Sequence, residues 1–585
     1  MRTLVTILSW LACGAAGISS AAVPSTAARL AAQNSLFEEQ WQTGLEESPE
    51  FSSYIGDYRH NDRLDDYSLA AIERRFARDE KYRVLLAAIS TAGFSEQDRL
   101  SHEIMLRALA QSAADYRFME YELPLSQMSG PHLALSDLPL WVPFDSVQRY
   151  EDYIARLKQI PRVFTQTEEV LRAGVRTGIV PVRFLLEKVP AQCEGVIAAN
   201  PFLTPTRKFP EGISAQEQER LTADITRVVN EQVLPAYKSF AAFVAAEYAP
   251  RGRTSLSTES LPDGKRRYVN EIRGQTTIND LSAAQIHQIG LQEIDRIEAQ
   301  MLVIARQQGF QDLPTYRAAL KVDKKYIPTS SEQILDDYRR YITQMQSKLP
   351  ALFGYIPALP VTVEALPDFQ AADSTQYRQG TPDGKRPGRV VVATADLPNR
   401  TMIDDEATAY HEGVPGHHMQ GSVALEMTTL PKFRQYYSNA GYAEGWALYA
   451  EQLGKEVGFY QDPNSDYGRL TSDMFRAVRL VVDTGIHSQG WSREQVVEFF
   501  HKYAVVDEPT IQAETDRYIS WPGQALAYKL GQLKMRELRE RAQRELGAKF
   551  DVRKFHDELL NGGVVPLDLL SNHIDRWIAA SKAGG

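Results

Sequence analysis

Apolar residues recur at intervals of three and four positions along most of this chain, the spacing that places them on one face of an α-helix. The pattern predicts long amphipathic helices within residues 66–114, 145–172, 215–246, 282–308 and 330–349, and again from residue 404 to the end. The alternation typical of strands is confined to residues 361–363 and 389–394. We therefore predict a mainly α protein with a small β-sheet just before residue 404.

Turn-forming Pro and Gly residues interrupt the helical pattern around residues 249–264. This linker divides the chain into an N-terminal helical region, residues 23–260, and a second helical region, residues 261–585. We expect the two regions to form one clefted body. Residues 23–50 are rich in Ala and Ser and then polar, so we expect them to form a loose leader.

The first 22 residues have the pattern of a signal peptide. Arg2 is followed by a short apolar run, and small residues end the segment at Ala22. The run is too short and too rich in Gly and Ala to span a membrane. We therefore predict an exported protein, periplasmic or secreted. A lipid anchor through Cys13 is the weaker alternative, because Trp10 stands where a smaller aliphatic residue is expected.

Composition and charge exclude several classes of protein. Apolar residues make up 43 % of the chain, enough for a large core, and the net charge of −10 argues against a nucleic-acid-binding protein, which needs a concentrated basic face. Without residues 1–22, Cys193 is the only cysteine, so no internal disulfide is expected. No other segment is apolar enough to be an integral membrane span.

The candidate chemistry lies in residues 410–418, whose sequence is YHEGVPGHH. In a common zinc-hydrolase motif, two histidines stand at positions i and i+4 of one helix, and the Glu beside the first is the general base. Here Pro415 occupies the i+4 position after His411. In an unbroken helix, His417 would lie about 120° round and roughly 9 Å along from His411, and His418 about 10.5 Å along, too far for one zinc ion.

The residues between the histidines predict how the chain overcomes this distance. Pro415 cannot continue a helix, and the glycines on either side allow a tight bulge. Two residues looped out would make His411 and His417 an effective i, i+4 pair. We therefore predict that these two histidines are metal ligands, that Glu412 is the general base and that His418 is a neighbouring wall residue. The alternative is a helix end with incidental histidines.

A catalytic zinc ion needs three protein ligands and one open position. Residues 443–451, AEGWALYAE, carry Glu444 and Glu451 on one helical face of an otherwise apolar segment, and a buried carboxylate needs a partner or a metal. Glu444 follows His417 by 27 residues, enough for a helix, a loop and a returning helix. We predict that Glu444 is the third ligand of Zn²⁺ and that Glu451 orients a ligand histidine. The alternative is that both carboxylates are solvated.

We predict that two later segments line the walls of the site. Arg479, Asp483 and His487 follow one another at four-residue steps and share one helical face if the helix continues through Gly485. Asp483 could then orient His487. The alternative is a salt-bridged helix end.

The second segment is residues 516–529, DRYISWPGQALAYK. Tyr528 heads a helix after a Pro-Gly turn, a rigid place from which a phenol can stabilise an oxyanion. Arg517 and Tyr518 are expected to support the site or to bind substrate.

These motifs resemble those of the DUF885 family of bacterial proteins, whose members resemble zinc peptidases of the HExxH clan. The resemblance covers most of the chain after the leader and is carried by residues 410–418, 441–451, 483–487 and 517–534. Residues 416–420 also resemble the second half of the zinc helix in angiotensin-converting-enzyme-like and thimet-like peptidases, although the spacing between the histidines is longer here.

The resemblance implies a fold and a mode of substrate binding. It implies a helical clamshell with a deep channel and a small β-sheet beside the zinc-binding helix. It also implies a Glu on the next helix as third ligand, approximately at Glu444. Residues 389–394 would be an edge strand that pairs with the substrate backbone.

We therefore expect an exported zinc metallopeptidase that cleaves short peptides. Zn²⁺ would acidify water, and Glu412 would accept its proton and pass it to the leaving amine. Tyr528 or His487 would help to hold the oxyanion. Two alternatives stay open: a zinc-dependent amidase acting on a non-peptide amide, and a non-catalytic exported peptide-binding protein.

Overall fold

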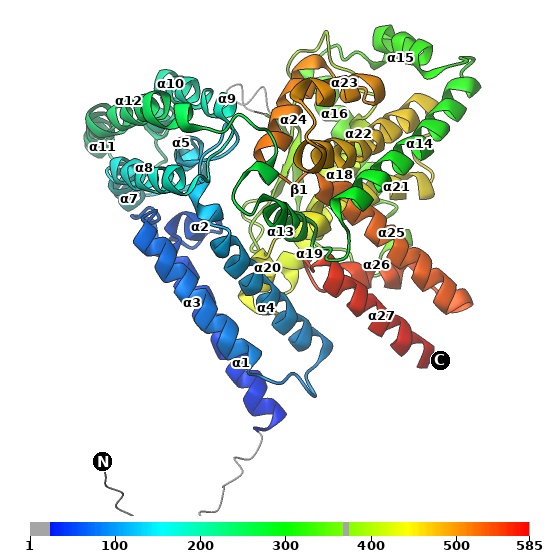
Figure 1. Ribbon diagram of the computed structural model, residues 1–585, viewed down its shortest axis with the longest axis horizontal. Coiled ribbons are helices and arrows are strands. Elements are labelled where there is room, and N and C mark those ends of the chain that lie inside the picture. The colour runs from blue at the N-terminus through cyan, green and yellow to red at the C-terminus, as the bar shows by residue number, and fades with distance from the viewer. Residues whose placement is uncertain (1–23, 367–373, 584–585) are drawn as a thin grey trace, which may run out of the picture.

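The computed structural model describes residues 24–366 and 374–583 and is mainly helical (Figure 1). Before residue 260 the helices are α1 (Thr26–Glu47), α2 (Pro49–Tyr54), α3 (Leu69–Ala87), α4 (Glu96–Arg117), α5 (Pro131–Ala134), α6 (Leu138–Trp141), α7 (Val147–Leu157), α8 (Ile160–Thr177), α9 (Arg183–Leu186), α10 (Val189–Ala199), α11 (Ala215–Val228) and α12 (Leu234–Phe243). The predicted signal peptide, with Cys13, lies outside the described residues.

The second half of the chain is again mainly helical. Its helices are α13 (Gly264–Thr276), α14 (Ala283–Gln307), α15 (Leu313–Val322), α16 (Ser331–Gln346), α17 (Leu349–Leu352), α18 (Asp405–Glu412), α19 (His417–Glu426), α20 (Lys432–Tyr436), α21 (Ala440–Glu456), α22 (Pro463–Gln489), α23 (Arg493–Tyr503), α24 (Glu508–Ser520), α25 (Leu526–Leu546), α26 (Val552–Leu560) and α27 (Leu567–Ala583). The prediction of a mainly α protein is confirmed. No helix in the described ranges is long and apolar enough to cross a membrane.

Helix α1 corrects one prediction, since residues 26–47 do not form a loose leader. The Ser25 side chain accepts a hydrogen bond from Ala28 N and caps the helix. Phe37 and Leu45 are buried and join the core of the molecule. The Ala- and Ser-rich composition hid a helix whose apolar residues are few but well placed.

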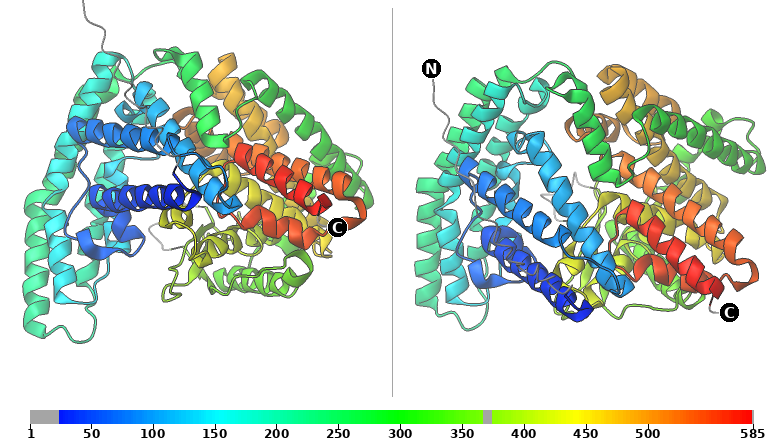
Figure 2. Two further views of the ribbon diagram at one scale, coloured as in Figure 1. Left: turned by 90° about the horizontal axis from the view of Figure 1, so that it is seen from below. Right: turned by 60° about the horizontal axis from the view of Figure 1, so that its bottom comes forward.

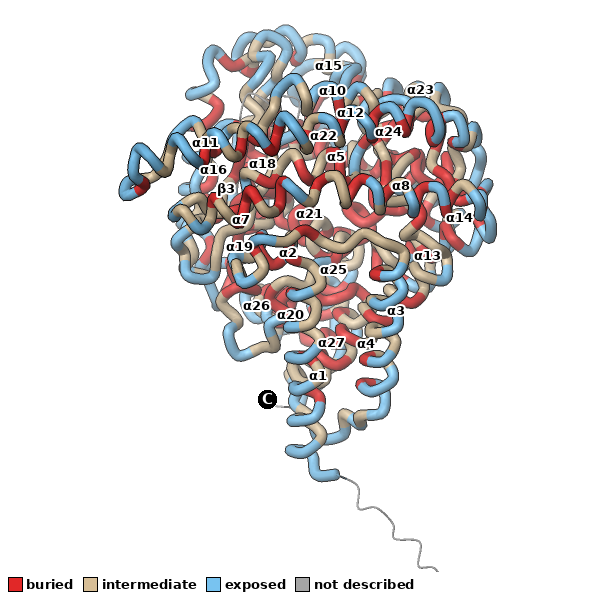
Figure 3. The backbone as a smooth tube through the Cα atoms, turned by 90° about the vertical axis from the view of Figure 1, so that its left-hand side faces the viewer, coloured by how far each residue is buried: buried red, intermediate tan, exposed pale blue. Residues whose placement is uncertain are grey.

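Buried residues form three clusters, two of which cross the predicted boundary at residue 260 (Figure 3). One lies within the group α7–α12, at the left of Figure 1. A second joins α1, α3 and α4 to the sheet and to α21, α25 and α27. In Figure 2 the blue helices α3 and α4 run from the first group towards the red C-terminal helices, where α4 contacts α27. The third joins α14 to α22, α23 and α24.

A three-stranded sheet precedes α18, as the strand pattern predicted. Its order is β1 (Val361–Ala365), β3 (Gly388–Val392), β2 (Gln376–Arg378), with β1 parallel and β2 antiparallel to β3. The expectation that residues 389–394 form an edge strand is therefore wrong, because β3 is paired on both sides. The strand that the sequence did not reveal, β2, occupies the edge next to the candidate site.

Helix α22 is the longest helix of the second half and carries several candidate residues. It begins at the Asp462 cap with Pro463 in its first turn and ends at Gly490, whose φ of +71° suits glycine. It continues through Gly485, where a side chain would collide with the ring of Trp491. The predicted face of Arg479, Asp483 and His487 therefore lies on one continuous helix.

Close packing of α21 against α25 positions the helix that carries Glu444. A Cβ atom on Gly445 would lie 2.5 Å from the backbone of Gly531, and a Cβ on Gly531 would lie 2.0 Å from the carbonyl oxygen of Gly441. Both distances are far below van der Waals contact, so the two helices approach this closely only because glycines face each other.

Gly445→Ala should therefore push α21 away from α25. Overpacking of this kind costs typically about 1–3 kcal/mol, so we expect a lower midpoint of thermal unfolding. The matched control is Gly195→Ala on α10, where nothing lies within 4 Å of the added methyl group. That variant should unfold at the same temperature as the wild type or slightly higher, because Ala favours the helix. Equal unfolding midpoints for the two variants would show that α21 and α25 do not pack as closely as described.

Candidate metal centre

A four-residue turn between α18 and α19 brings two histidines together. Helix α18 ends at Glu412 and α19 begins at His417, so four residues leave the helical path where the sequence predicted two. Gly416 N donates to Tyr410 O, and a Cβ on Gly416 would lie 1.9 Å from the carbonyl oxygen of His411. Only glycine fits there. The Trp446 indole of α21 donates to Pro415 O and holds the turn from the other side.

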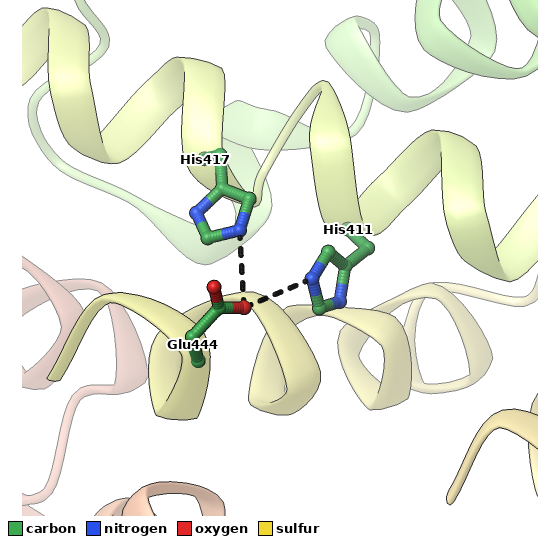
Figure 4. A group of neighbouring side chains, drawn as sticks. All are labelled: His411, His417 and Glu444. Carbon is green, nitrogen blue, oxygen red and sulfur yellow. Dashed lines mark ion pairs between the residues drawn. The ribbon is translucent and has the colours of Figure 1, made fainter. Parts of the chain in front are cut away.

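The turn places His411 and His417 face to edge, with ring centroids 4.9 Å apart. Both rings point at Glu444 of α21 (Figure 4). Nε2 of His411 lies 3.5 Å and Nε2 of His417 3.4 Å from the same carboxylate oxygen of Glu444. One ligand atom from each residue lies within 4.8 Å of the others. The structure thus brings together the three residues that the sequence predicted as ligands.

A second carboxylate orients His411 from behind. Nδ1 of His411 donates to Glu451 Oε1 over 2.8 Å, and Ser472 also donates to that oxygen. A neutral imidazole that donates from Nδ1 keeps its lone pair on Nε2, the atom that faces Glu444. Glu451 therefore selects the tautomer that can bind a metal through Nε2.

The electrostatics of the cluster favour a cation. Burial alone would lower the pKa of His411, but hydrogen bonds to Glu444 and Glu451 and the charge of Glu412 outweigh it and raise the pKa to about 9. Burial would raise the pKa of Glu444, but hydrogen bonds from the two histidines hold it well below its usual range. The positive charge that a proton brings to His411 could thus be supplied instead by a metal ion between His411 and Glu444.

The donor set fits zinc. Two imidazoles and one carboxylate are a common ligand set of catalytic zinc sites, in which a fourth position stays open. With metal–ligand bonds of about 2.0–2.1 Å, two ligands of a tetrahedral ion lie roughly 3.4 Å apart. The separations of 3.4 and 3.5 Å between the histidine nitrogens and Glu444 match this value.

Glu412, the residue after the first histidine, is held by the edge strand. Tyr377 N of β2 donates to Glu412 Oε2 over 2.8 Å. Glu412 is 9 % exposed and lines the same pocket as the histidines. The backbone of β2 therefore fixes one of its carboxylate oxygens at the wall of this pocket.

His418 points away from the cluster. Its Nε2 donates to Leu359 O and its Nδ1 accepts from the hydroxyl of Tyr377. Burial lowers its pKa to about 4, so the ring is neutral. His418 therefore ties α19 to the sheet, while its neighbour His417 faces the other candidate ligands.

The far wall of the pocket is rich in arginine. Arg479 of α22 donates to Glu514 of α24 and to the hydroxyl of Tyr518, and its guanidinium lies 4.4 Å from the ring centre of Tyr528. Arg517 donates to the hydroxyl of Tyr528 over 3.1 Å. Tyr528 lines the pocket with both arginines, whereas Tyr518 lies behind them and supports Arg479. Because the Tyr528 hydroxyl accepts from Arg517, its own proton is free to be donated.

His487 and Asp483 do not join the site, and here the structure corrects the prediction. His487 is fully buried and accepts from Thr258 N at Nδ1, while Nε2 donates to Tyr518 O. Both ring nitrogens are therefore occupied by backbone, and burial lowers the pKa of the ring to about 3. Asp483 contacts the Tyr268 hydroxyl and Gly523 N instead of His487. Burial raises its pKa to about 7.

The candidate ligands lie in a pocket of about 510 Å³. It is lined by the cluster His411, Glu412, His417 and Glu444, by residues 374–377 at the edge of the sheet, and by Arg476, Arg479, Glu514, Arg517 and Tyr528. Sequence reasoning missed Tyr377, since a three-residue strand has no detectable pattern. It also missed Arg476 and Glu514. Glu514 stands three residues before Arg517 on a helix, a spacing that could have suggested the pair.

Comparison with known proteins gives a family and a fold. The model of a family described as bacterial protein of unknown function (DUF885) matches residues 49–574. A "putative lipoprotein" from Colwellia psychrerythraea has 28 % sequence identity and a TM-score of 0.89, and the match covers 95 % of this chain and 100 % of that one. A second structure is described as a "putative lipoprotein of unknown function" from Shewanella oneidensis. It has 17 % sequence identity and a TM-score of 0.72, and the match covers 94 % of this chain and 99 % of that one. No curated protein matches the chain.

We predict one zinc ion per chain, bound by His411, His417 and Glu444. His411→Ala and His417→Ala should each lose the metal, because two ligands rarely hold zinc against dilution. His418→Ala should keep it and serves as the matched control, since this neighbouring ring faces the sheet. Elemental analysis of protein purified without chelator tests this. Protein that takes up no zinc even when zinc is added, or a His418→Ala variant that alone loses it, would contradict the assignment.

We also predict that Glu451→Gln weakens zinc binding without abolishing it. Loss of the charge behind His411 should lower the affinity about 10- to 100-fold, the usual effect of removing a group that orients a metal ligand. The control is Glu456→Gln on the same helix, whose carboxylate pairs with Arg539. Competition with a chromogenic chelator measures both affinities. Equal zinc affinities for the two variants would mean that Glu451 does not orient the metal ligand His411.

Proposed function

This chain belongs to the DUF885 family of bacterial proteins of unknown function, so its activity has to be inferred from its own site, and we propose that it is an exported zinc metallopeptidase that hydrolyses short peptides. One observation carries the proposal. His411, His417 and Glu444 offer three ligand atoms within 4.8 Å of one another, and Glu412 lines the same pocket. This is the set of groups that metal-assisted hydrolysis of an amide requires.

The order of these groups along the chain supports a peptidase. It resembles that of the HExxH zinc peptidases, with a Glu after the first histidine and a Glu ligand on a later helix. The turn at Gly416 accommodates the longer interval between the histidines and places both rings beside Glu444, which supports the proposal of one shared ion.

The chain's own residues would divide the chemistry among them. When bound, zinc supplies Lewis acidity, which acidifies water and polarises a carbonyl group. Glu412 would accept a proton from water at Oε1 while Tyr377 N holds Oε2, and would later transfer that proton to the leaving amine. Tyr528 would donate its hydroxyl proton in a hydrogen bond to the oxyanion, since Arg517 already donates to its oxygen.

The pocket suits a short extended peptide. Its volume of about 510 Å³ accommodates a few residues and excludes a folded protein. Residues 374–377 line the pocket at the edge of the sheet, so an extended peptide bound in the pocket would lie beside β2. The strand beside the substrate would therefore be β2 and not residues 389–394, which contain the central strand β3.

Export rests on the N-terminal sequence and on the relatives. Residues 1–22 have the pattern of a signal peptide, and the two similar structures are each described as a "putative lipoprotein". An exported protein with a peptidase site would trim or scavenge peptides outside the cytoplasm. The relatives' description favours testing for a lipid on Cys13 by intact mass.

Glu412→Gln should keep zinc and the fold but lose peptidase activity. An amide cannot accept the proton, and loss of a general base typically lowers the rate about 10²- to 10⁴-fold. Incubation with a mixed peptide library, with and without chelator and followed by mass spectrometry, measures activity in the wild type and the variant. Glu508→Gln, at an exposed site on α24, is the control and should behave as the wild type. A Glu412→Gln variant with most of its activity would rule out this base.

A further inference from the structure

Three arginines line the pocket that holds the candidate metal ligands. Arg476 and Arg479 lie on α22 and Arg517 lies on α24. The carboxylate among them is Glu514, which accepts hydrogen bonds from Arg479 and Arg517 and from Tyr518. Arg476 donates to the Ser472 hydroxyl and carbonyl and has no ion pair among the described residues. This wall therefore carries three positive charges and one negative charge.

Part of the donor capacity of these arginines is unused. Arg479 Nη1, Arg517 Nε and Arg476 Nε are buried and have no hydrogen-bond partner in the part of the chain that the structure describes. The Arg479 side chain is 5 % exposed. A buried guanidinium N–H without a partner costs free energy, and a negative charge in the pocket would offset the excess positive charge of this wall. The planar guanidinium group matches a carboxylate in both charge and geometry.

We infer that Arg476, Arg479 and Arg517 bind a carboxylate of the substrate, so that the pocket takes peptides with a free C-terminus. This inference rests on the proposed function and names its substrate class. The carboxylate would lie against the guanidinium groups that line the pocket and would balance the excess positive charge. Among the described residues, neither Glu412 nor Glu444 forms an ion pair with these arginines: Glu412 accepts from Tyr377 N, and Glu444 lies beside the two histidines.

Tyr528 lies among these arginines. Its ring centre lies 4.4 Å from the Arg479 guanidinium and 5.9 Å from that of Arg517, and its hydroxyl accepts a hydrogen bond from Arg517. In the proposed mechanism Tyr528 contacts the reacting carbonyl, so the carboxylate bound by the arginines would belong to the leaving end of the peptide, close to the bond that is cleaved.

The first test compares peptides of identical sequence that end in a free carboxylate or in a carboxamide. The free acid should be cleaved with a kcat/KM about 10²-fold higher, the effect of losing a charge-assisted hydrogen-bond partner. A third peptide, amidated at its C-terminus but carrying Asp or Glu as its last residue, separates a side-chain carboxylate from the terminal one. Recovery of the rate with this peptide would move the recognised carboxylate to the side chain and overturn the C-terminal assignment. Equal rates for acid and amide would overturn the inference altogether.

The second test measures binding, which does not depend on turnover. Zinc-loaded Glu412→Gln protein should bind the acid more tightly than the amide in calorimetry. Adding Arg476→Gln or Arg517→Gln should weaken binding of the acid about 10- to 100-fold and leave binding of the amide unchanged. Arg476→Lys should restore part of the affinity, because it restores the charge. Arg227→Gln, on the surface of α11, is the matched control.

The two tests separate failure of the inference from failure of the proposed function. If no peptide is cleaved by the wild-type protein, the proposed hydrolase is wrong, and binding still decides the inference. Preference for the acid that disappears in the Arg476 and Arg517 variants supports it. Equal binding of acid and amide, or a preference that survives both substitutions with the metal content intact, overturns it.

Discussion

The candidate site depends on the close approach of Gly416 to the carbonyl oxygen of His411. A side chain at position 416 would lie 1.9 Å from that oxygen, so the chain can double back here only through glycine. The return places His417 beside His411 instead of roughly 9 Å away along a continuous helix. Trp446 holds the turn from α21, the helix that also supplies Glu444, so the turn and the third candidate ligand are positioned by one element.

The pocket has two electrostatic regions with opposite preferences. Around the histidines, Glu412, Glu444 and Glu451 attract a cation and raise the pKa of His411 to about 9. Around Tyr528, the arginines of α22 and α24 attract an anion. A substrate with one polarisable carbonyl and one nearby carboxylate would satisfy both regions. The long helix α22, which carries two of these arginines, is buried along most of its length because it packs against α14, α18, α21, α23, α24 and α25.

The fold was predictable where the hydrophobic pattern is strong and long. The helices within residues 282–308 and 330–349, those after residue 404 and the strands near residues 361 and 389 were expected from spacing, whereas α15 was not. Helix α1 was not, because its few apolar residues resemble a leader by composition. Strand β2 was not, because three residues carry no periodicity, and its discovery changed which strand borders the site.

The sequence by itself determined the candidate ligands. The spacing from His411 to His417, the Pro and Gly residues between them and the carboxylates of residues 443–451 are local features, and local features constrain backbone geometry directly. Only the tertiary structure decided which later residues share the pocket. Asp483 and His487 lie on the predicted face of α22 together with Arg479, yet their part of that face packs against α13 and residues 257–258, while Arg479 lines the pocket. Helical periodicity shows which residues share a face, but the partner that covers each part of the face depends on contacts between segments hundreds of residues apart.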